Sequence, residues 1–162
     1  MATIILQTDI AAPRERVFDL ARSIDAHQDT AAATGERAVA GVTSGLLGLD
    51  EEVTWQAKHF GVVQKLRVKM TLFERPSHFR DVMLEGAFRS MQHDHSFEEK
   101  DGKTVMIDRF EFFAPLGILG RIAEQLFLIC YMRGFIEERN AVLKQTAESE
   151  GWRKYLPDEI RG

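Results

Sequence analysis

Two alternating stretches of sequence flank the Asp101-Gly102 pair and predict a long β-hairpin over residues 88–113. An Asp-Gly pair is typical of tight hairpin turns because both turn positions need a positive φ. Because side chains alternate between faces, symmetric pairing about this turn places four cross-strand pairs on one face. The pairs are Phe97 with Met106, His95 with Asp108, His93 with Phe110, and Met91 with Phe112. We expect this face, which mixes apolar and titratable groups, to point into the protein.

The other face of the same hairpin supports this register. It places Asp94 opposite Arg109, Ser96 opposite Ile107 and Gln92 opposite Glu111, a mostly polar set. Opposite charges that face each other across two strands stabilise the pairing. The two faces therefore indicate the same alignment of the strands.

The rest of the chain predicts strands and helices in a simple order. Residues 3–10 alternate as a strand, and residues 13–33 have the spacing of two short helices that begin after a proline. Residues 36–113 read as strand after strand, separated by glycines and turns. Apolar residues then recur every three or four positions over residues 115–151, which predicts a long helix. Residues 152–162 are interpreted as a tail.

This order, β-α-α-β6-α, predicts an α+β fold in which a curved antiparallel sheet of about seven strands wraps around the long C-terminal helix. The chain has 162 residues, of which 44% are hydrophobic, and this is enough for one domain with a core or a core and a cavity. We therefore expect a single domain over residues 1–151.

Several short motifs carry a resemblance to a known family. They are Phe79-Arg80-Asp81, Gly86-Ala87-Phe88, His93-Asp94-His95-Ser96-Phe97, Thr104-Val105-Met106-Ile107-Asp108, Pro115-Leu116-Gly117 and the segment from Ala12 to Ala21. With them, nearly the whole chain resembles the START/Bet v 1-like superfamily, also called SRPBCC or polyketide cyclase/dehydrase-like, and within it a bacterial subgroup. The resemblance implies a helix-grip fold with a deep cavity between sheet and helix.

Members of that superfamily include lipid and sterol carriers, coenzyme Q-binding proteins, plant hormone receptors and aromatic polyketide cyclases. The resemblance therefore implies binding or sequestration of a small hydrophobic ligand of lipid, quinone or polyketide type, without fixing which one. No catalytic residues of a superfamily enzyme match positions of this sequence, so the resemblance favours a binding protein over an enzyme and implies no cofactor.

The candidate ligand-binding residues lie on the inner faces of the predicted strands and on the apolar stripe of the long helix. They are Trp55, His59, Asp81, Met83, Met91, His93, His95, Phe97, Met106, Asp108, Phe110, Phe112, Leu126 and Cys130. A packed core is the alternative interpretation of the same pattern. A face that carries two histidines and an aspartate is costly to pack without water, and this favours a cavity.

The polar cluster of His93, His95 and Asp108 allows three interpretations. Two imidazoles and a carboxylate are the ligand types of a facial zinc or iron site. The histidines can also bond inward carboxylates, Asp108 or Asp81, without any metal. A His95-Asp108 pair could finally move a proton in a cyclase or dehydratase reaction, although no nucleophile is evident.

A protein-interaction module is a further alternative, using the long helix or the loop from Gly41 to Leu49. That loop carries Leu46, Leu47 and Leu49 without neighbouring charges, so it either gates a cavity or caps the core.

The bulk properties exclude several classes. A net charge of −4 argues against a nucleic-acid partner, and the alternating Lys65, Arg67 and Lys69 read as the solvated face of a strand. The N-terminus lacks a signal sequence, the single cysteine excludes a disulfide framework, and the apolar run from Leu126 to Met132 is too short to span a bilayer. We expect a cytoplasmic monomer or homodimer with no integral membrane segment.

Overall fold

A computed structural model describes residues 1–114 and 121–158. One antiparallel sheet has seven strands in the order β1-β7-β6-β5-β4-β3-β2. The strands are β1 (Ala2–Ile10), β2 (Arg37–Gly41), β3 (Glu52–His59), β4 (Val62–Glu74), β5 (His78–Glu85), β6 (Ser90–Lys100) and β7 (Lys103–Phe113). The helices are α1 (Arg14–Ala21), α2 (Ile24–Thr30) and α3 (Arg121–Glu148), with the short 3-10 turns η1 (Ala32–Thr34) and η2 (Glu150–Lys154).

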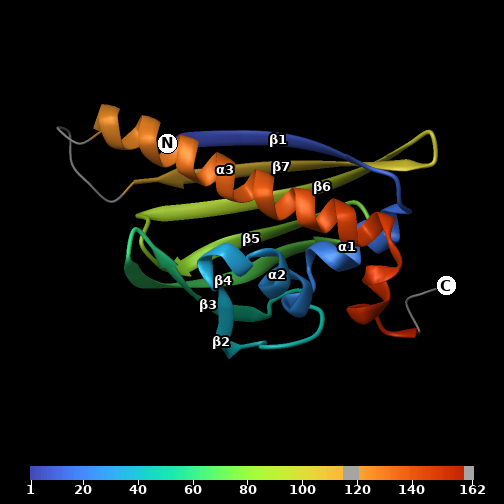
Figure 1. Ribbon diagram of the computed structural model, residues 1–162. Helices are drawn as coiled ribbons and strands as arrows, with labels where there is room; N and C mark the ends of the chain where they lie inside the picture. The colour runs from blue at the N-terminus through green and yellow to red at the C-terminus, as the bar shows by residue number, and fades with distance from the viewer. Residues whose placement is uncertain (115–120, 159–162) are drawn as a thin grey trace.

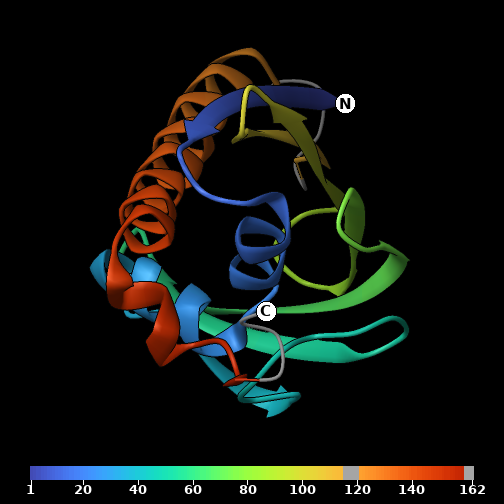
Figure 2. The same ribbon diagram turned by 90° about the vertical axis from the view of Figure 1, so that its right-hand side faces the viewer.

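The sheet is strongly curved, and α3 runs diagonally across its inner side (Figure 1). Viewed from one end, the strands curve from β1 to β2 around an interior that α3 closes on the remaining side (Figure 2). The sheet can bend in this way because register shifts interrupt the ladders between β2 and β3 and between β4 and β5. This is the predicted helix-grip α+β architecture.

The hairpin of β6 and β7 has the predicted register throughout. Asp101 and Gly102 both have positive φ, 53° and 72°, and Lys100 pairs with Lys103, so the loop has two residues. His95 pairs with Asp108, and Asp94 pairs with Arg109 on the other face. The turn and the alternation therefore determine which side chains of this hairpin enter the interior.

One end of the interior is filled by α1. The ring of Phe18 is fully buried and packs edge-on against Phe73, Phe79 and Phe97, with centroids 5.5, 5.4 and 5.3 Å apart. Next to it, the buried Asp19 carboxylate lies 2.7 Å from guanidinium nitrogens of both Arg22 and Arg75. Aromatic packing and a paired buried charge thus close this end.

The long helix buries a narrower stripe than the sequence predicts. Ile136, Asn140, Leu143 and Ala147 are buried at intervals of three and four residues. Leu126 is 63% exposed and Cys130 is also exposed, so their predicted burial is wrong. Both lie in the half of α3 that precedes the packed region, where the helix has fewer neighbours that bury its apolar side chains.

The segment that the sequence predicts as a tail begins inside the core. Trp152, in η2, is only 4% exposed, and Leu156 is 2% exposed. The guanidinium of Arg16 lies 4.3 Å above the Trp152 ring, which ties this segment to α1. Residues 152–156 therefore pack against the domain, which the composition of a short C-terminal stretch does not reveal.

The loop from Gly41 to Leu49 caps the core near α1 and α2. Leu47 is buried and its N–H donates to the carbonyl of Arg22, while Leu46 forms a β-bridge with Ser23. Leu49 remains 52% exposed. Of the two interpretations of this loop, the contacts favour a cap.

The Pro115-Leu116-Gly117 motif lies outside the described residues. Among helices in the described parts of the chain, none is long and apolar enough to cross a bilayer.

Candidate functional site

An apolar cavity of about 430 Å³ lies at the end of the interior opposite α1. It is bounded by β3, β4, the loop between β5 and β6, the end of β7 and the first half of α3. The described residues that line it are Glu36, Trp55, Ala57, His59, Phe60, Gln64, Lys65, Leu66, Ala87, Phe88, Ala114, Phe127, Leu128, Tyr131, Met132 and Phe135. Most of these side chains are aromatic or aliphatic, so the cavity suits an apolar molecule.

A few polar groups interrupt this lining. The Nδ1 atom of His59 and the hydroxyl of Tyr131 are 2.7 Å apart, which joins β3 to α3 by a hydrogen bond. Burial raises the pKa of the Tyr131 hydroxyl, and the nearby Glu36 carboxylate adds to this rise. The cavity therefore offers a neutral hydroxyl and an imidazole as polar contacts.

Glu36 brings a buried negative charge to the same cavity. Its Oε2 lies 3.0 Å from Nε2 of His27, whose ring stacks on Trp55 at a centroid distance of 4.1 Å. Burial alone would raise the pKa of Glu36, but the neighbouring His27, Arg139 and His59 outweigh burial and lower it. Glu36 is therefore ionised at neutral pH.

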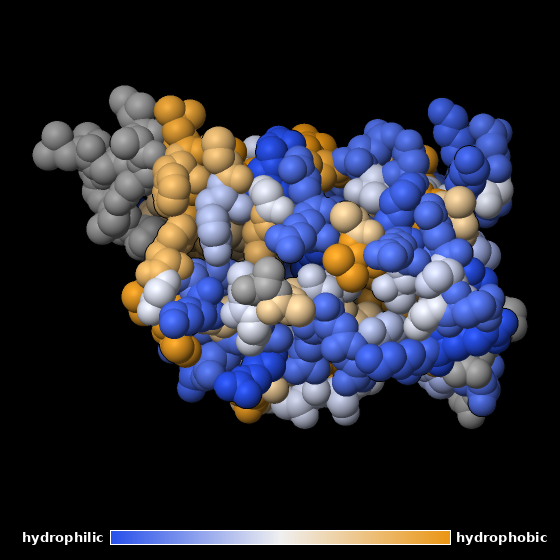
Figure 3. All heavy atoms as spheres, in the orientation of Figure 1, coloured by the Kyte–Doolittle hydropathy of each residue, from blue (hydrophilic) through white to orange (hydrophobic). Residues whose placement is uncertain are grey.

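Large apolar side chains are exposed around the mouth of the cavity. Phe60 and Phe127 are 56% and 61% exposed, and their rings lie 5.5 Å apart. Val62 and Val63, at the tip of the β3-β4 hairpin, are similarly exposed. In Figure 3, hydrophobic surface gathers at the end of the molecule where α3 begins. The turn between β3 and β4, which carries Phe60, and α3, which carries Phe127, thus meet at the mouth through apolar contacts.

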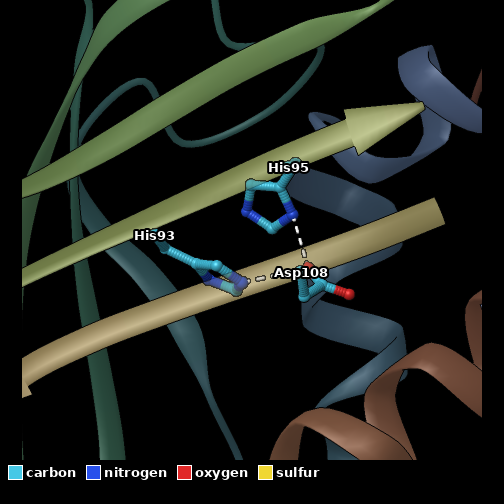
Figure 4. Close-up of side chains that lie close together, drawn as sticks. All are labelled: His93, His95 and Asp108. Atoms are coloured by element: carbon cyan, nitrogen blue, oxygen red, sulfur yellow. Dashed lines mark hydrogen bonds and ion pairs between the residues drawn. The ribbon is translucent and has the colours of Figure 1, made fainter. Parts of the chain in front are cut away.

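A buried polar cluster lies deeper in the interior, on the inner face of the hairpin of β6 and β7 (Figure 4). The Asp108 carboxylate is 1% exposed, and its Oδ1 lies 3.0 Å from Nε2 of His93 and 2.8 Å from Nδ1 of His95. On the other side, Nδ2 of Asn140 in α3 donates to Oδ2 of Asp108 at 2.6 Å. One carboxylate therefore connects β6, β7 and α3.

The electrostatics of this cluster follow from its burial. Desolvation lowers the pKa of His95 to about 3, with the neighbouring His93 as the next cause, and it lowers the pKa of His93 as well. Burial opposes ionisation of Asp108, but the adjoining imidazoles lower its pKa well below the ordinary value. The cluster thus holds an ionised carboxylate between neutral histidines.

A small cavity of about 40 Å³ adjoins the cluster on the side of α2. Its lining includes Asp81, His95, His27, Trp55 and Arg139. Burial raises the pKa of Asp81 to about 7. A water molecule needs about 10 to 15 Å³ of such space, so the small cavity has room for a few waters, whereas ligand sites typically measure about 300 Å³ or more.

The structure divides the predicted site residues into separate groups. His59 lines the large cavity, Asp81 and His95 line the small one, and Trp55 lies in the wall of both. Met91, Phe97, Met106, Phe110 and Phe112 are buried in the core, and Met83 packs against it partly buried. Leu126 and Cys130 are exposed and do not belong to either lining.

Phe110 separates the polar cluster from the large cavity. Its ring contacts Phe88 of the cavity wall at 6.2 Å and His93 of the cluster at 5.2 Å between centroids. Sequence alternation correctly places Phe110 and the polar cluster on the inner face of the sheet. It does not show which part of the interior is packed with side chains and which part is a cavity.

Sequence reasoning missed several residues of the cavity wall, including Glu36, Phe60 and Phe88. On α3, Leu128, Tyr131 and Phe135 line the cavity at intervals of three and four residues. That spacing is a helical signal present in the sequence. It was obscured because this half of the helix is apolar on several sides.

Comparison with solved structures identifies the fold. A START superfamily protein from Mycobacterium smegmatis matches with a TM-score of 0.68 and 10% identity, over 90% of this chain and 97% of that chain. The chain has a START/Bet v 1-like fold. Protein TTHA0849 from Thermus thermophilus matches with a TM-score of 0.70 and 16% identity, over 91% of this chain and 100% of that one.

Major latex-like protein 151 from Panax ginseng is also similar in fold to this chain, with a TM-score of 0.67 and 12% identity over 91% of this chain and 98% of that one. Neither a family sequence model nor a curated protein sequence matches the chain. The likeness therefore establishes the fold, and the function has to be argued from the site.

Proposed function

We propose that the protein binds a small hydrophobic ligand in the cavity between β3, β4 and α3. The observation that carries this proposal is a space of about 430 Å³ with a largely apolar wall. Protein sites for small molecules typically have volumes of about 300 to 1,000 Å³ and a few polar groups among apolar ones. A curved sheet that faces a long helix supports a site of this kind.

The wall also indicates the kind of ligand. Trp55, Phe88 and Phe135 offer flat aromatic surface, while Glu36 and the His59-Tyr131 pair provide a small polar region. A molecule with an apolar body and one polar group, of lipid, quinone or polyketide type, fits this chemistry. A ligand that buries about 300 Å² of apolar surface gains about 7.5 kcal/mol at about 25 cal/mol per Å², before the costs of association.

An enzymatic role for the His95-Asp108 pair receives less support. The cavity that His95 lines measures about 40 Å³, and Phe110 stands between His93 and the large cavity. A general acid or base must come within hydrogen-bond reach of its substrate. For the interaction-module alternative, the burial of Leu47 leaves a smaller apolar surface on the loop from Gly41 to Leu49.

The remaining proposals concern partners and location. Arg67 pairs with Glu52 at 2.5 Å and Lys69 pairs with Asp50 at 2.8 Å, which supports a neutralised outer strand face and no nucleic-acid partner. A cytoplasmic location and a monomeric or homodimeric state stay predictions from the sequence.

The proposal is tested with an anilinonaphthalene sulfonate dye, which fluoresces in apolar sites. Leu128→Trp places an indole in the cavity from α3, and Leu84→Trp is the matched control because Leu84 is 47% exposed and lies outside the cavity lining. We expect saturable one-to-one dye binding by the unmodified protein and by Leu84→Trp, and at least about tenfold weaker binding by Leu128→Trp. Equal binding by all three proteins would contradict the proposed location of the site.

A further inference from the structure

Three ligand-type side chains converge in the buried polar cluster, and none of them lines the large cavity. His93, His95 and Asp108 each offer one donor atom, and the three atoms lie within 4.8 Å of one another. The side chains project from paired strands, because His95 is directly opposite Asp108 in the β6-β7 ladder. Rigid backbone therefore holds the three donors together (Figure 4).

The two distances from the histidine nitrogens to the Asp108 oxygen are compatible with ligands that share one ion. Nε2 of His93 and Nδ1 of His95 lie 3.0 and 2.8 Å from the same Asp108 oxygen. Donors bound to a divalent metal at about 2.1 Å are separated by about 3.0 Å at right angles and about 3.4 Å at the tetrahedral angle. Small side-chain movements would thus bring all three atoms to bonding distance.

Hydrogen bonding accounts for only one of these two contacts. Nε2 of His93 is hydrogen-bonded to Oδ1 of Asp108, whereas Nδ1 of His95 makes a close 2.8 Å contact with the same oxygen without the alignment of a good hydrogen bond. A structural histidine-carboxylate pair directs its N–H at the oxygen. A short contact without that alignment leaves Nδ1 of His95 able to bind a further partner.

The lack of a well-aligned hydrogen bond at Nδ1 is significant because His95 is only 2% exposed. A buried polar atom without a hydrogen bond is costly, so native structures rarely retain one without a reason. Asn140, which is 3% exposed, also keeps its Oδ1 without a partner among the described residues. The cluster therefore has more acceptor capacity than its own hydrogen bonds satisfy.

The groups around the three donors have positions typical of an outer coordination shell. Nδ2 of Asn140 holds Oδ2 of Asp108 and leaves Oδ1 directed at the histidines. On the far side of the His95 ring, Nε2 lies 3.8 Å from the Asp81 carboxylate. Metal-binding histidines commonly direct their second ring nitrogen at a carboxylate, which fixes the tautomer and the orientation of the ring.

We propose that His93 Nε2, His95 Nδ1 and Asp108 Oδ1 bind a divalent transition-metal ion, with Asn140 and Asp81 as positioning residues. Two imidazoles and one carboxylate suit zinc or ferrous iron, and they do not suit magnesium or calcium, which prefer oxygen ligands. The site is separate from the hydrophobic cavity, so either proposal can fail without the other.

The test uses zinc on the chelator-treated full chain, followed by calorimetric titration. Asp108→Asn is the principal variant because it keeps the shape of the side chain. His78→Ala is the matched control, since Nε2 of His78 is bonded to Asp94 at 2.7 Å in a second histidine-carboxylate pair, outside the proposed ligand set. We expect one equivalent of zinc per chain, binding weakened about 100-fold or more in Asp108→Asn, and unchanged binding in His78→Ala.

A second measurement on the unmodified protein avoids the risk that a core variant fails to fold. Long-range proton-nitrogen NMR spectra resolve the ring nitrogens of each histidine. On addition of zinc, we expect Nε2 of His93 and Nδ1 of His95 to shift, while the signals of His78 stay in place. Absence of stoichiometric zinc binding, or shifts confined to the other histidines, would overturn the proposal, as would undiminished zinc affinity in a folded Asp108→Asn variant.

Discussion

The two ends of the interior are built from the same sheet and the same helix, yet one is packed and the other is hollow. At the packed end, α1 inserts Phe18 among three aromatic rings, and the C-terminal segment adds Trp152 and Leu156. At the hollow end, a cavity of about 430 Å³ remains among the described residues. The comparison indicates that the tight packing that stabilises the fold and the proposed ligand site lie at different ends of the interior.

The largest expected effect on stability comes from removing the ring of Phe18 at the packed end. Phe18→Ala should lower the free energy of unfolding by about 3 to 5 kcal/mol, because it leaves a cavity where the ring was fully buried. Phe127→Ala, at the hollow end, should change it by about 0.5 kcal/mol or less, since that ring is 61% exposed. Urea unfolding of both variants measures the difference, and similar losses would refute the division between the two ends.

A second, smaller effect on stability concerns the buried Glu36 carboxylate, which lines the cavity at the hollow end. Glu36→Gln should cost about 1.5 to 3 kcal/mol at neutral pH, because His27 loses a charged hydrogen-bond partner. The pKa of Glu36 is lowered in the folded protein, with His27 on α2, Arg139 on α3 and His59 on β3 as the neighbours responsible. The paired carboxylate therefore stabilises the fold above its unfolded pKa, and this contribution is lost as pH falls through the folded pKa.

The pH dependence of unfolding checks this prediction. We expect the unmodified protein to lose stability as pH falls below about 4.5, and Glu36→Gln to lose less over the same interval. Asp25→Asn provides a control on α2, because Asp25 is hydrogen-bonded only to the backbone N–H of Gly45 among the contacts described. Parallel pH profiles for the unmodified protein and Glu36→Gln would show that Glu36 makes no such contribution.

The smallest expected effect lies in the wall of the cavity. Tyr131→Phe removes the hydroxyl that bonds His59 and should cost about 0.5 to 1.5 kcal/mol of stability. The ring itself remains, so binding of a purely apolar ligand should be retained, while a ligand with a polar group should lose up to about tenfold in affinity. Titration with a matched pair of ligands, with and without a hydroxyl, distinguishes these outcomes, and equal losses for both would remove the polar role assigned to Tyr131.

The sequence predicts the hairpin register well because its determinants are local. The Asp101-Gly102 turn sets the alignment, and strict alternation then decides the face of every residue from Met91 to Phe112. The element order is similarly visible, since a change of period from two to three or four marks the start of the long helix. The helix-grip architecture follows from that order.

The division of the inner face into core, cluster and cavity could not be predicted in the same way. Phe97 and Trp55 both point inward, but Phe97 contacts the ring of Phe18 whereas Trp55 lines the cavity. This difference depends on which residues from distant parts of the sequence pack against each side chain. The exposure of Leu126 and Cys130 has the same origin, because the surroundings of α3 change along its length. Periodicity gives the direction of a side chain and leaves its surroundings undetermined.

Native mass spectrometry of the gently purified protein, followed by denaturing extraction, tests most directly whether the hollow end is a binding site. We predict a one-to-one adduct whose extracted molecule is apolar, present in the unmodified protein and in Leu84→Trp and lost in Leu128→Trp. An adduct that Leu128→Trp retains undiminished, or the absence of an adduct together with a failure to bind any apolar probe, would contradict a ligand-binding function for this cavity.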